Sequence, residues 1–313
     1  MGKVIILLGP TGVGKTAVSI LIARHLDTEI ISADSMQIYK HMDIGTAKPS
    51  IEEQQVVKHH MIDIVEPWEH YSTGEYIKAV RPILENLQKD KKIPIIVGGT
   101  GLYIKAMTRG IFKGPSADWD LRNKLLEIDK GLPGYLYEYL KSLDPVAASK
   151  IMPADTRRII RALEVCLKTN SVISEMHQLL TQSLPYEFIK IGITRDRKEL
   201  YRMIEQRVDK MINAGLVDEV KNVIQMIKEH FSRSGLNSSL SSMQAIGYKE
   251  IAAHLEGELS LDEAITLIKK RSKNYAKRQF TWFKKEDDIK WINATGIQDP
   301  SEMFKKVLQF IHA

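Results

Sequence analysis

The sequence predicts an α/β fold, in which a parallel sheet carries helices on both faces and an all-helical domain is inserted. In the first hundred residues short apolar runs alternate with helical patterns, which is the order of a parallel sheet covered on both sides. The run KVIILL at 3–8 leads directly into GPTGVGKT at 9–16, which has the G-x-x-x-x-G-K-[ST] spacing of a phosphate-binding loop. Residues 116–184 show helical patterns and no convincing strand. Together these features predict a P-loop NTPase-like core with a helical insertion.

The core elements follow in order along the chain. Functional residues of parallel sheets gather where the strands end, so we expect the loop at 9–16, Asp34 and Thr100 to lie at one edge of the sheet. Buried apolar strands and amphipathic helices alternate in the way that this architecture requires. The expected elements are a strand at 3–8, a helix at 16–26, a strand at 28–34, a helix at 73–90 and a strand at 92–100.

Beyond Gly114-Pro115 the pattern changes to helices. EFIKIGIT at 187–194 then returns to a core strand, and a long helix follows at 197–215, with Gly215 as its stop signal. The serine-rich stretch 232–243 is expected to be a mobile loop. Helical patterns in the insertion cover 117–129, 134–144, 154–170 and 174–182. We therefore assign 1–115 and 185–313 to the P-loop core with a basic C-terminal region, and 116–184 to the insertion domain.

Composition limits the possible classes of protein. Hydrophobic residues make up 43% and charged residues 27% of the 313, which is typical of a soluble globular protein. No apolar run is long enough to span a membrane, and we expect neither a signal peptide nor a membrane partner. Cys166 is the single cysteine, which excludes an internal disulfide and any zinc site with two cysteines. We expect a cytoplasmic protein.

The loop at 9–16 has the strand before it and the helix after it that phosphate binding needs. Backbone N–H groups and the start of the helix attract an anion, Lys15 adds a positive charge, and the Thr16 hydroxyl can bind Mg²⁺. The expected phosphate-binding residues are Gly9, Pro10, Thr11, Gly12, Val13, Gly14, Lys15 and Thr16.

Two further motifs have both a functional and a structural interpretation. Asp34 is either a proton acceptor or metal ligand opposite the loop, or a cap of the next helix. GGTGLY around Thr100 is either a second anion site or a plain turn. The adjacent His59 and His60 do not converge on a strand or helix, so we expect no metal there.

Basic residues point to a polyanionic partner. The net charge of +6 permits one, and IKKRSKNYAKRQFTWFKK at 268–285 has eight Lys or Arg, no acid and four interleaved aromatic residues. A solvated helix face is the alternative for this segment and for Arg157, Arg158 and Arg161. The interleaved aromatic rings favour a nucleic-acid surface at 268–285, with Lys277 and Arg278 as contacts.

The phosphate in the loop need not belong to ATP. A kinase or ATPase normally has an acidic residue at the end of another core strand, whereas IPIIV ends in Gly98-Gly99-Thr100. Because Asp34 could serve a kinase as well, spacing alone leaves a small-molecule kinase or NTPase with a helical lid as an alternative. A non-catalytic RNA-binding protein is a third interpretation, which would leave the Asp34 site idle.

The motifs resemble those of one family, the tRNA dimethylallyltransferases or tRNA isopentenyltransferases, in order and over residues 9–283. The second and the last motif are highly specific, and the serine-rich stretch fits the family pattern least. The matching segments are GPTGVGKT, ISADSMQIYKHMDIGTAKP, HHMIDIVEP, VGGTGLY, DTRRIIRALEV, GLVDEV, QAIGYKE and YAKRQFTWF.

The resemblance implies a P-loop that holds the diphosphate of dimethylallyl diphosphate. The prenyl group passes to N6 of the adenosine immediately 3′ of the anticodon in tRNA, and the insertion clasps the anticodon stem-loop. Asp34 is implied as general base, with Lys15, Thr16, Thr100 and Arg207 as catalytic partners of diphosphate and Mg²⁺. Besides Lys277 and Arg278, the expected tRNA contacts are Asp34, Ser35, Met36, Gln37, Thr100, Arg122, Arg157, Arg158, Ile159, Ile160, Arg161, Gln244, Ala245, Ile246, Gly247, Tyr248 and Lys249. We expect a monomer.

Overall fold

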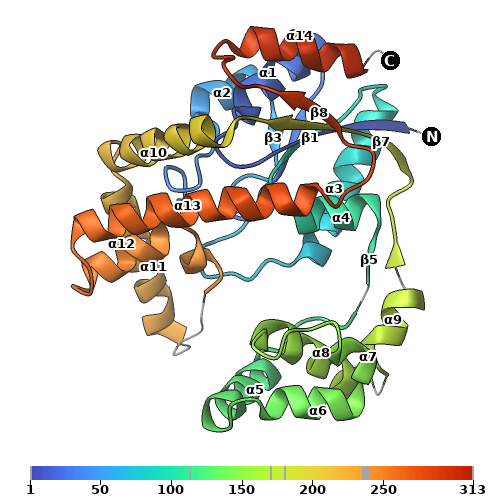
Figure 1. The fold of residues 1–313 in the computed structure, drawn as a ribbon, viewed down its shortest axis with the longest axis vertical. Helices are drawn as coiled ribbons and strands as arrows, with labels where there is room; N and C mark the ends of the chain where they lie inside the picture. Colours follow the sequence, from blue (N-terminus) through green and yellow to red (C-terminus); the bar gives the residue numbers. More distant parts are fainter. Residues whose placement is uncertain (1, 113, 170, 180, 235–239, 312–313) are drawn as a thin grey trace. The chain divides into compact units, whose positions relative to one another are not determined.

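In a computed structural model, the protein consists of two compact units (Figure 1). One unit comprises residues 1–104 and 185–313, and the other comprises residues 105–184. The structure describes residues 2–112, 114–169, 171–179, 181–234 and 240–311. The sequence predicted that the second unit begins at residue 116. In the structure it begins at Lys105, within α4 (Gly101–Thr108), so the end of this helix belongs to the second unit.

The first unit is built on a six-stranded parallel sheet with the order β3-β2-β4-β1-β7-β8. Its strands are β1 (Gly2–Leu8), β2 (Ile30–Ala33), β3 (His59–His60), β4 (Ile95–Gly98), β7 (Tyr186–Thr194) and β8 (Lys290–Asn293). The expected parallel α/β core is thus confirmed. The sequence prediction missed β3 and β8, the two edge strands, which are too short to carry a periodic pattern.

Helices cover both faces of this sheet, as expected (Figure 1). Ile5 and Leu7 of β1 pack in one cluster with Val18 of α1 (Lys15–His25) and Val307 of α14 (Pro300–Ile311). On the opposite face lies α3 (Thr73–Lys89), whose buried Tyr76 donates from its hydroxyl to the Ser32 carbonyl of β2 at 3.0 Å.

The remaining helices of this unit build the walls beside the sheet. They are α2 (Ile51–Val56), α10 (Arg197–Asn213), α11 (Leu216–Ser234), the short 3₁₀ helix η1 (Ser242–Gln244), α12 (Tyr248–Leu255) and α13 (Leu261–Phe283). A second cluster joins the segment after β2 to all of these helices except α2, through Ile38, Val208, Leu216, Tyr248 and Ile268. Of the predicted loop at 232–243, residues 235–239 lie outside the described residues, and its two ends belong to α11 and η1.

The second unit is mainly helical, with its own core around Leu125, Leu136, Leu140 and Leu163. Its helices are α5 (Trp119–Gly131), α6 (Tyr135–Leu143), α7 (Pro145–Ala148), α8 (Thr156–Thr169) and α9 (Ile173–Leu179). The expectation of an all-helical insertion needs one correction, because β5 (Ile111–Phe112) and β6 (Thr181–Gln182) pair antiparallel. Across the described ranges, no helix combines the length and the apolar character needed to cross a membrane.

Candidate active site

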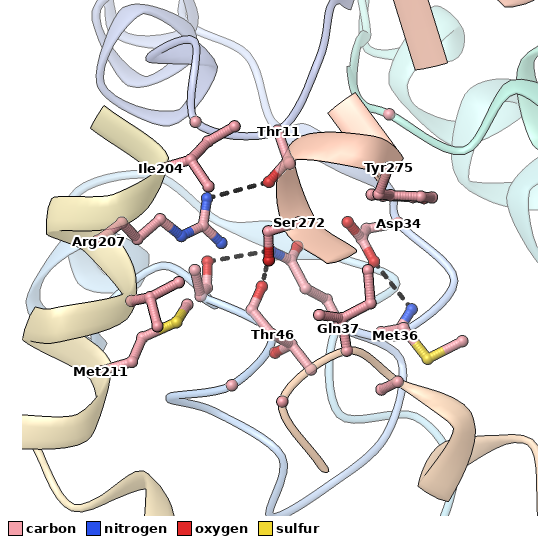
Figure 2. Close-up of a pocket in the computed structure, with 18 of the residues that line it drawn as sticks. Thr11, Asp34, Met36, Gln37, Thr46, Ile204, Arg207, Met211, Ser272 and Tyr275 are labelled. Atoms are coloured by element: carbon pink, nitrogen blue, oxygen red, sulfur yellow. Dashed lines mark hydrogen bonds between the residues drawn. The ribbon is translucent and has the colours of Figure 1, made fainter. Parts of the chain in front are cut away.

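A cavity of about 920 Å³ in the first unit brings Asp34, Arg207 and most of the phosphate loop together, whereas Thr100 is not among its lining residues. Figure 2 shows Arg207 and Met211 of α10 in this cavity together with Asp34, Gln37 and Thr46 from the segment after β2. Its wall is formed by the phosphate loop, 34–37, 45–47, 97–99, 244–247 and parts of α10 and α13. The cavity therefore lies where the strands of the parallel sheet end, which is the position expected for a ligand site in this architecture.

The phosphate loop connects β1 directly to α1. Gly12 and Gly14 have φ angles of +80° and +101°, in the left-handed region where a side chain would strain the backbone. Gly14 is the N-cap of α1, and no side chain caps this helix. The start of α1 thus keeps N–H groups and the positive end of the helix dipole available for an anion.

Lys15 lies in the loop with its ammonium group folded back on the backbone. Its Nζ donates to the carbonyls of Gly9 and Pro10, at 2.9 Å each. Burial lowers the pKa of Lys15 to about 8, the nearby Asp34 charge opposes this, and the Arg207 charge adds to it. Anionic oxygens would complete the solvation of this amine and favour its charged form.

Arg207 approaches the same loop from α10. Its Nη1 donates to the Thr11 hydroxyl at 3.2 Å (Figure 2). Burial lowers the pKa of Arg207, and the charge of Asp34 opposes this change. Two cations with incomplete solvation therefore face the cavity at the loop, 192 positions apart in sequence (207 − 15).

Asp34 follows β2 and both closes a local turn and lines the cavity. Its Oδ1 accepts from the Met36 backbone N–H at 2.8 Å, and the next described helix begins only at Ile51, so the interpretation of Asp34 as a helix cap is wrong. The carboxylate also lines the cavity and points toward Tyr275 of α13 (Figure 2). Thr100 is close by, since its Oγ1 accepts from the Ser35 N–H at 3.0 Å.

Gln279 of α13 is a site residue that sequence reasoning missed. Its Oε1 accepts from the Thr11 N–H at 2.8 Å, and its Nε2 donates to the Gly99 carbonyl at 2.9 Å. A Cβ at Gly99 would come within 2.2 Å of Nε2, so a larger residue cannot occupy that position without displacing the amide. The sequence signal was weak, because Gln279 is one of two neutral amides, with Asn274, in the basic segment 268–285.

The side-chain amide of Gln37 makes hydrogen bonds within the protein. Its Oε1 accepts from the Ser32 hydroxyl at 2.9 Å, and its Nε2 donates to the carbonyls of Thr46 and Ala47 at 3.3 and 3.1 Å. The side-chain amide is therefore engaged in holding the segment after β2. A tRNA contact by Gln37 stays a prediction.

The segment 244–249 divides between the cavity and the core. Gln244, Ala245, Ile246 and Gly247 line the cavity. Tyr248 is fully buried and Lys249 is exposed.

In the second unit, Arg122 and Arg161 bind a buried carboxylate. Arg122 makes a bidentate pair with Glu164, at 2.9 and 2.7 Å, and Arg161 pairs with the same residue. Both guanidinium groups are therefore partly committed to the fold of this unit. Ile159 and Ile160 are buried in its core.

Arg157 and Arg158 of α8 are exposed, so their charged groups are accessible to a polyanion. The tRNA contacts of the insertion stay predictions.

His59 and His60 have separate partners. His59 Nδ1 lies 2.7 Å from the Val57 carbonyl, and His60 Nε2 lies 2.5 Å from Glu29. In the part of the chain that the structure describes, no group of three or more His, Cys, Asp or Glu residues could hold a metal ion. A metal at the phosphate loop would instead use hydroxyl and phosphate oxygens.

Lys277 and Arg278 are exposed on α13, and Arg278 also lines the cavity and lies over the Tyr275 ring at 5.7 Å.

Reversal of both charges, Lys277→Glu with Arg278→Glu, should weaken binding to all tRNAs. The slope of log affinity against log salt should fall by about one unit for each phosphate that the variant no longer neutralises. The measurement is a salt titration of tRNA affinity. Lys305→Glu with Lys306→Glu, an equal charge change on two exposed residues of α14, is the matched control. An unchanged slope would mean that Lys277 and Arg278 contact no phosphates and only form a solvated helix face.

Known proteins are similar to this chain over most of its length. Residues 37–286 match the family model described as IPP transferase. A tRNA dimethylallyltransferase of Thermodesulfovibrio yellowstonii is 59% identical over 297 residues, which cover 95% of this chain and 93% of the relative.

Solved structures agree with this match. A full-length tRNA isopentenylpyrophosphate transferase from Bacillus halodurans has a TM-score of 0.71 and 38% identity, covering 100% of this chain and 96% of its own. A eukaryotic dimethylallyltransferase acting on tRNA has a TM-score of 0.79 and 29% identity, covering 100% of this chain and 80% of its own. The chain therefore belongs to the IPP transferase family, the tRNA dimethylallyltransferases that its motifs resemble.

Proposed function

We propose that this protein transfers the dimethylallyl group of dimethylallyl diphosphate to N6 of the adenosine immediately 3′ of the anticodon in tRNA. The observation that carries the proposal is the cavity in which Lys15 and Arg207 at the phosphate loop face Asp34. Such a cavity offers cations to a leaving diphosphate and a carboxylate to the proton of the attacking amine. We also propose that the protein acts as a monomer in the cytoplasm.

The cavity has a polar and an apolar part, as an allylic diphosphate requires. Lys15, Thr16 and Arg207 are polar groups around the loop. Met203, Val208, Met211, Leu216, Ile246 and Ile268 are apolar residues of the same lining. A five-carbon prenyl group placed against these side chains would leave water, at roughly 25 cal/mol per Å² of apolar surface buried.

The proposed reaction forms one bond and breaks another. The bond from N6 to C1 of the prenyl group forms while the bond from C1 to the diphosphate oxygen breaks, and the N6 proton passes to Asp34. N6 is a weak nucleophile because its lone pair is delocalised into the ring, so a carboxylate that accepts its proton raises its reactivity. Lys15 and Arg207 stabilise the charge that develops on the departing diphosphate.

Mg²⁺ fits the donor atoms at the loop. Mg²⁺ prefers oxygen ligands and substrate phosphates to cages made only of protein, and the Thr16 side chain at the start of α1 lines the cavity. We propose that Thr16 and the diphosphate oxygens hold the ion, which would neutralise part of the diphosphate charge.

The tRNA partner would present its adenine as an unpaired loop base. Turning such a base out of the loop stack costs a few kcal/mol, less than opening a base pair in a stem. Arg278 and Gln244 are exposed residues of the cavity lining, and Arg278 lies on the basic helix α13. We propose that the anticodon loop approaches the cavity from this side and that the insertion unit binds the stem.

The test is to incubate the protein with labelled dimethylallyl diphosphate and bulk tRNA. We expect label on tRNA, located by nuclease digestion on the adenosine 3′ of the anticodon, and no consumption of ATP. ATP turnover with no prenyl transfer would instead establish the kinase or NTPase alternative.

Lys15 makes diphosphate binding dependent on pH. Its pKa is lowered to about 8 by burial, so the free protein loses this charge as the pH rises through 8. The anion prefers the charged amine, and affinity for dimethylallyl diphosphate should therefore fall above pH 8, by up to about tenfold per pH unit. Calorimetric titration between pH 7 and 9.5 measures this. Lys15→Ala should show a flatter profile, and an equally steep one would assign the titration to another group.

A further inference from the structure

Glu219, near the start of α11, collects four hydrogen bonds from two distant parts of the chain. The backbone N–H groups of Asp43 and Ile44 donate to Oε2 at 2.9 and 2.7 Å, and that of Gly45 donates to Oε1 at 3.0 Å. The Tyr248 hydroxyl donates to Oε1 at 2.5 Å. A carboxylate has about four lone-pair sites, so this one is fully used. The proposed reaction gives none of these residues a role.

The N–H groups belong to a turn at 43–47 that forms part of the cavity wall. Gly45, Thr46 and Ala47 line the cavity. Ala47 has a φ of +49°, a left-handed conformation that a residue with a side chain adopts only where its surroundings impose it. Gln37 holds the carbonyls of Thr46 and Ala47 from inside the segment, and Glu219 holds the N–H groups from α11.

The same carboxylate fixes this turn against α11 and α12, and α11 adjoins α10, the helix that carries Arg207. A Cβ at Gly45 would come within 2.4 Å of the Tyr248 ring and 3.0 Å of Leu216, so the turn packs directly on α12 and on the start of α11. The corner between α10 and α11 is a tight one, at Gly215. α10 carries Arg207 and Met211 on the other side of the cavity (Figure 2). The Glu219 hydrogen bonds therefore set the distance between the turn and α10.

A second cavity adjoins the first. It measures about 740 Å³, and Asp43, Ile44 and Lys48 are among its lining residues. Thr16, Ala47, Arg207 and Met211 line both cavities. The two cavities thus adjoin along the phosphate loop, the turn and α10, and a displaced turn would open one cavity to the other.

We propose that Glu219 is a positioning residue that limits the length of the prenyl chain the cavity accepts. This inference rests on the proposed function, because the ligand is taken to be an allylic diphosphate. Holding the turn at its present distance from α10 keeps the second cavity separate from the first, so that a longer chain cannot extend into it. Release of the turn opens the space beyond it to a ten-carbon chain and weakens the fit of the shorter one.

The test compares dimethylallyl and geranyl diphosphate in the full-length protein. Glu219→Gln puts an amide, which is itself a donor, among three N–H groups, whereas Tyr248→Phe removes one of the four hydrogen bonds and keeps the ring. For Glu219→Gln we expect the ratio of the geranyl to the dimethylallyl dissociation constant to fall about tenfold or more. We expect the KM for dimethylallyl diphosphate to rise about tenfold, with kcat within about threefold of the wild type. Tyr248→Phe should change both in the same direction by less, and Asp218→Asn, an exposed neighbour, should change neither.

A merely structural role for Glu219 would lower the melting temperature and leave the ratio of dissociation constants unchanged. That result in either folded variant would overturn the inference, and Tyr248→Phe alone decides it if Glu219→Gln is insoluble. Because the ratio is an equilibrium measurement, it is independent of catalysis. A shifted ratio supports the positioning role even if the wild type transfers no prenyl group to tRNA, which would contradict only the proposed reaction.

Discussion

Asp34→Asn is expected to slow prenyl transfer by roughly the 10²–10⁴-fold that is typical of losing a general acid–base group. Asparagine has the size of aspartate, and its side-chain oxygen can still accept from the Met36 N–H, so the local turn should persist. The amide cannot take the N6 proton, however. Both substrates should therefore still bind, and single-turnover transfer at saturating tRNA and dimethylallyl diphosphate should show the reduced rate.

The control for this substitution is Asp27→Asn, since the Asp27 side chain is 98% exposed and follows the end of α1 that lies away from the phosphate loop. Asp34→Glu should recover little activity, because one more methylene group displaces the carboxylate by about an ångström from its alignment with N6. A near-normal single-turnover rate for Asp34→Asn would leave Asp34 with a structural role in the local turn only.

Lys15→Ala should lower kcat/KM for dimethylallyl diphosphate by about 10²–10³-fold, the range observed when one donor to a developing anion is removed. The Lys15 ammonium is placed in the loop by the Gly9 and Pro10 carbonyls, and alanine has no group that could take its place there. Calorimetry with dimethylallyl diphosphate and with inorganic diphosphate should show the weaker binding.

tRNA affinity, in contrast, should change little in Lys15→Ala, because Lys15 is enclosed at the loop. Lys3→Ala, which removes an exposed lysine of the adjoining β1, is the matched control. A parallel collapse of tRNA affinity would mean that the loop itself contacts the nucleic acid.

Local patterns in the sequence predicted the parts of the site that depend on neighbouring residues. The spacing of glycines, Lys15 and Thr16 defines the phosphate loop within eight positions, and Asp34 stands at the end of the strand predicted at 28–34. Parallel strands bring their carboxyl ends to one edge, so these two features could be placed together before the structure was known.

The parts that sequence reasoning missed depend on distant residues. Gln279 bonds to a loop 268 positions away, and Glu219 bonds to a turn 174–176 positions away. Neither interaction leaves a periodic pattern. The ion pair of Arg161, in contrast, could have been predicted from the sequence, because Glu164 is three positions later on the same helix face.

The bond between Thr11 and Gln279 also orders events during synthesis. The chain is made from the N-terminus, so the phosphate loop emerges early, while β7 and the amide that secures the loop emerge only after the insertion unit is complete. Contacts of such long sequence separation form slowly, whereas the helical insertion, with mostly local contacts, can fold while the remainder is still being translated. The site that is proposed to bind the diphosphate is therefore completed only when nearly the entire chain has left the ribosome.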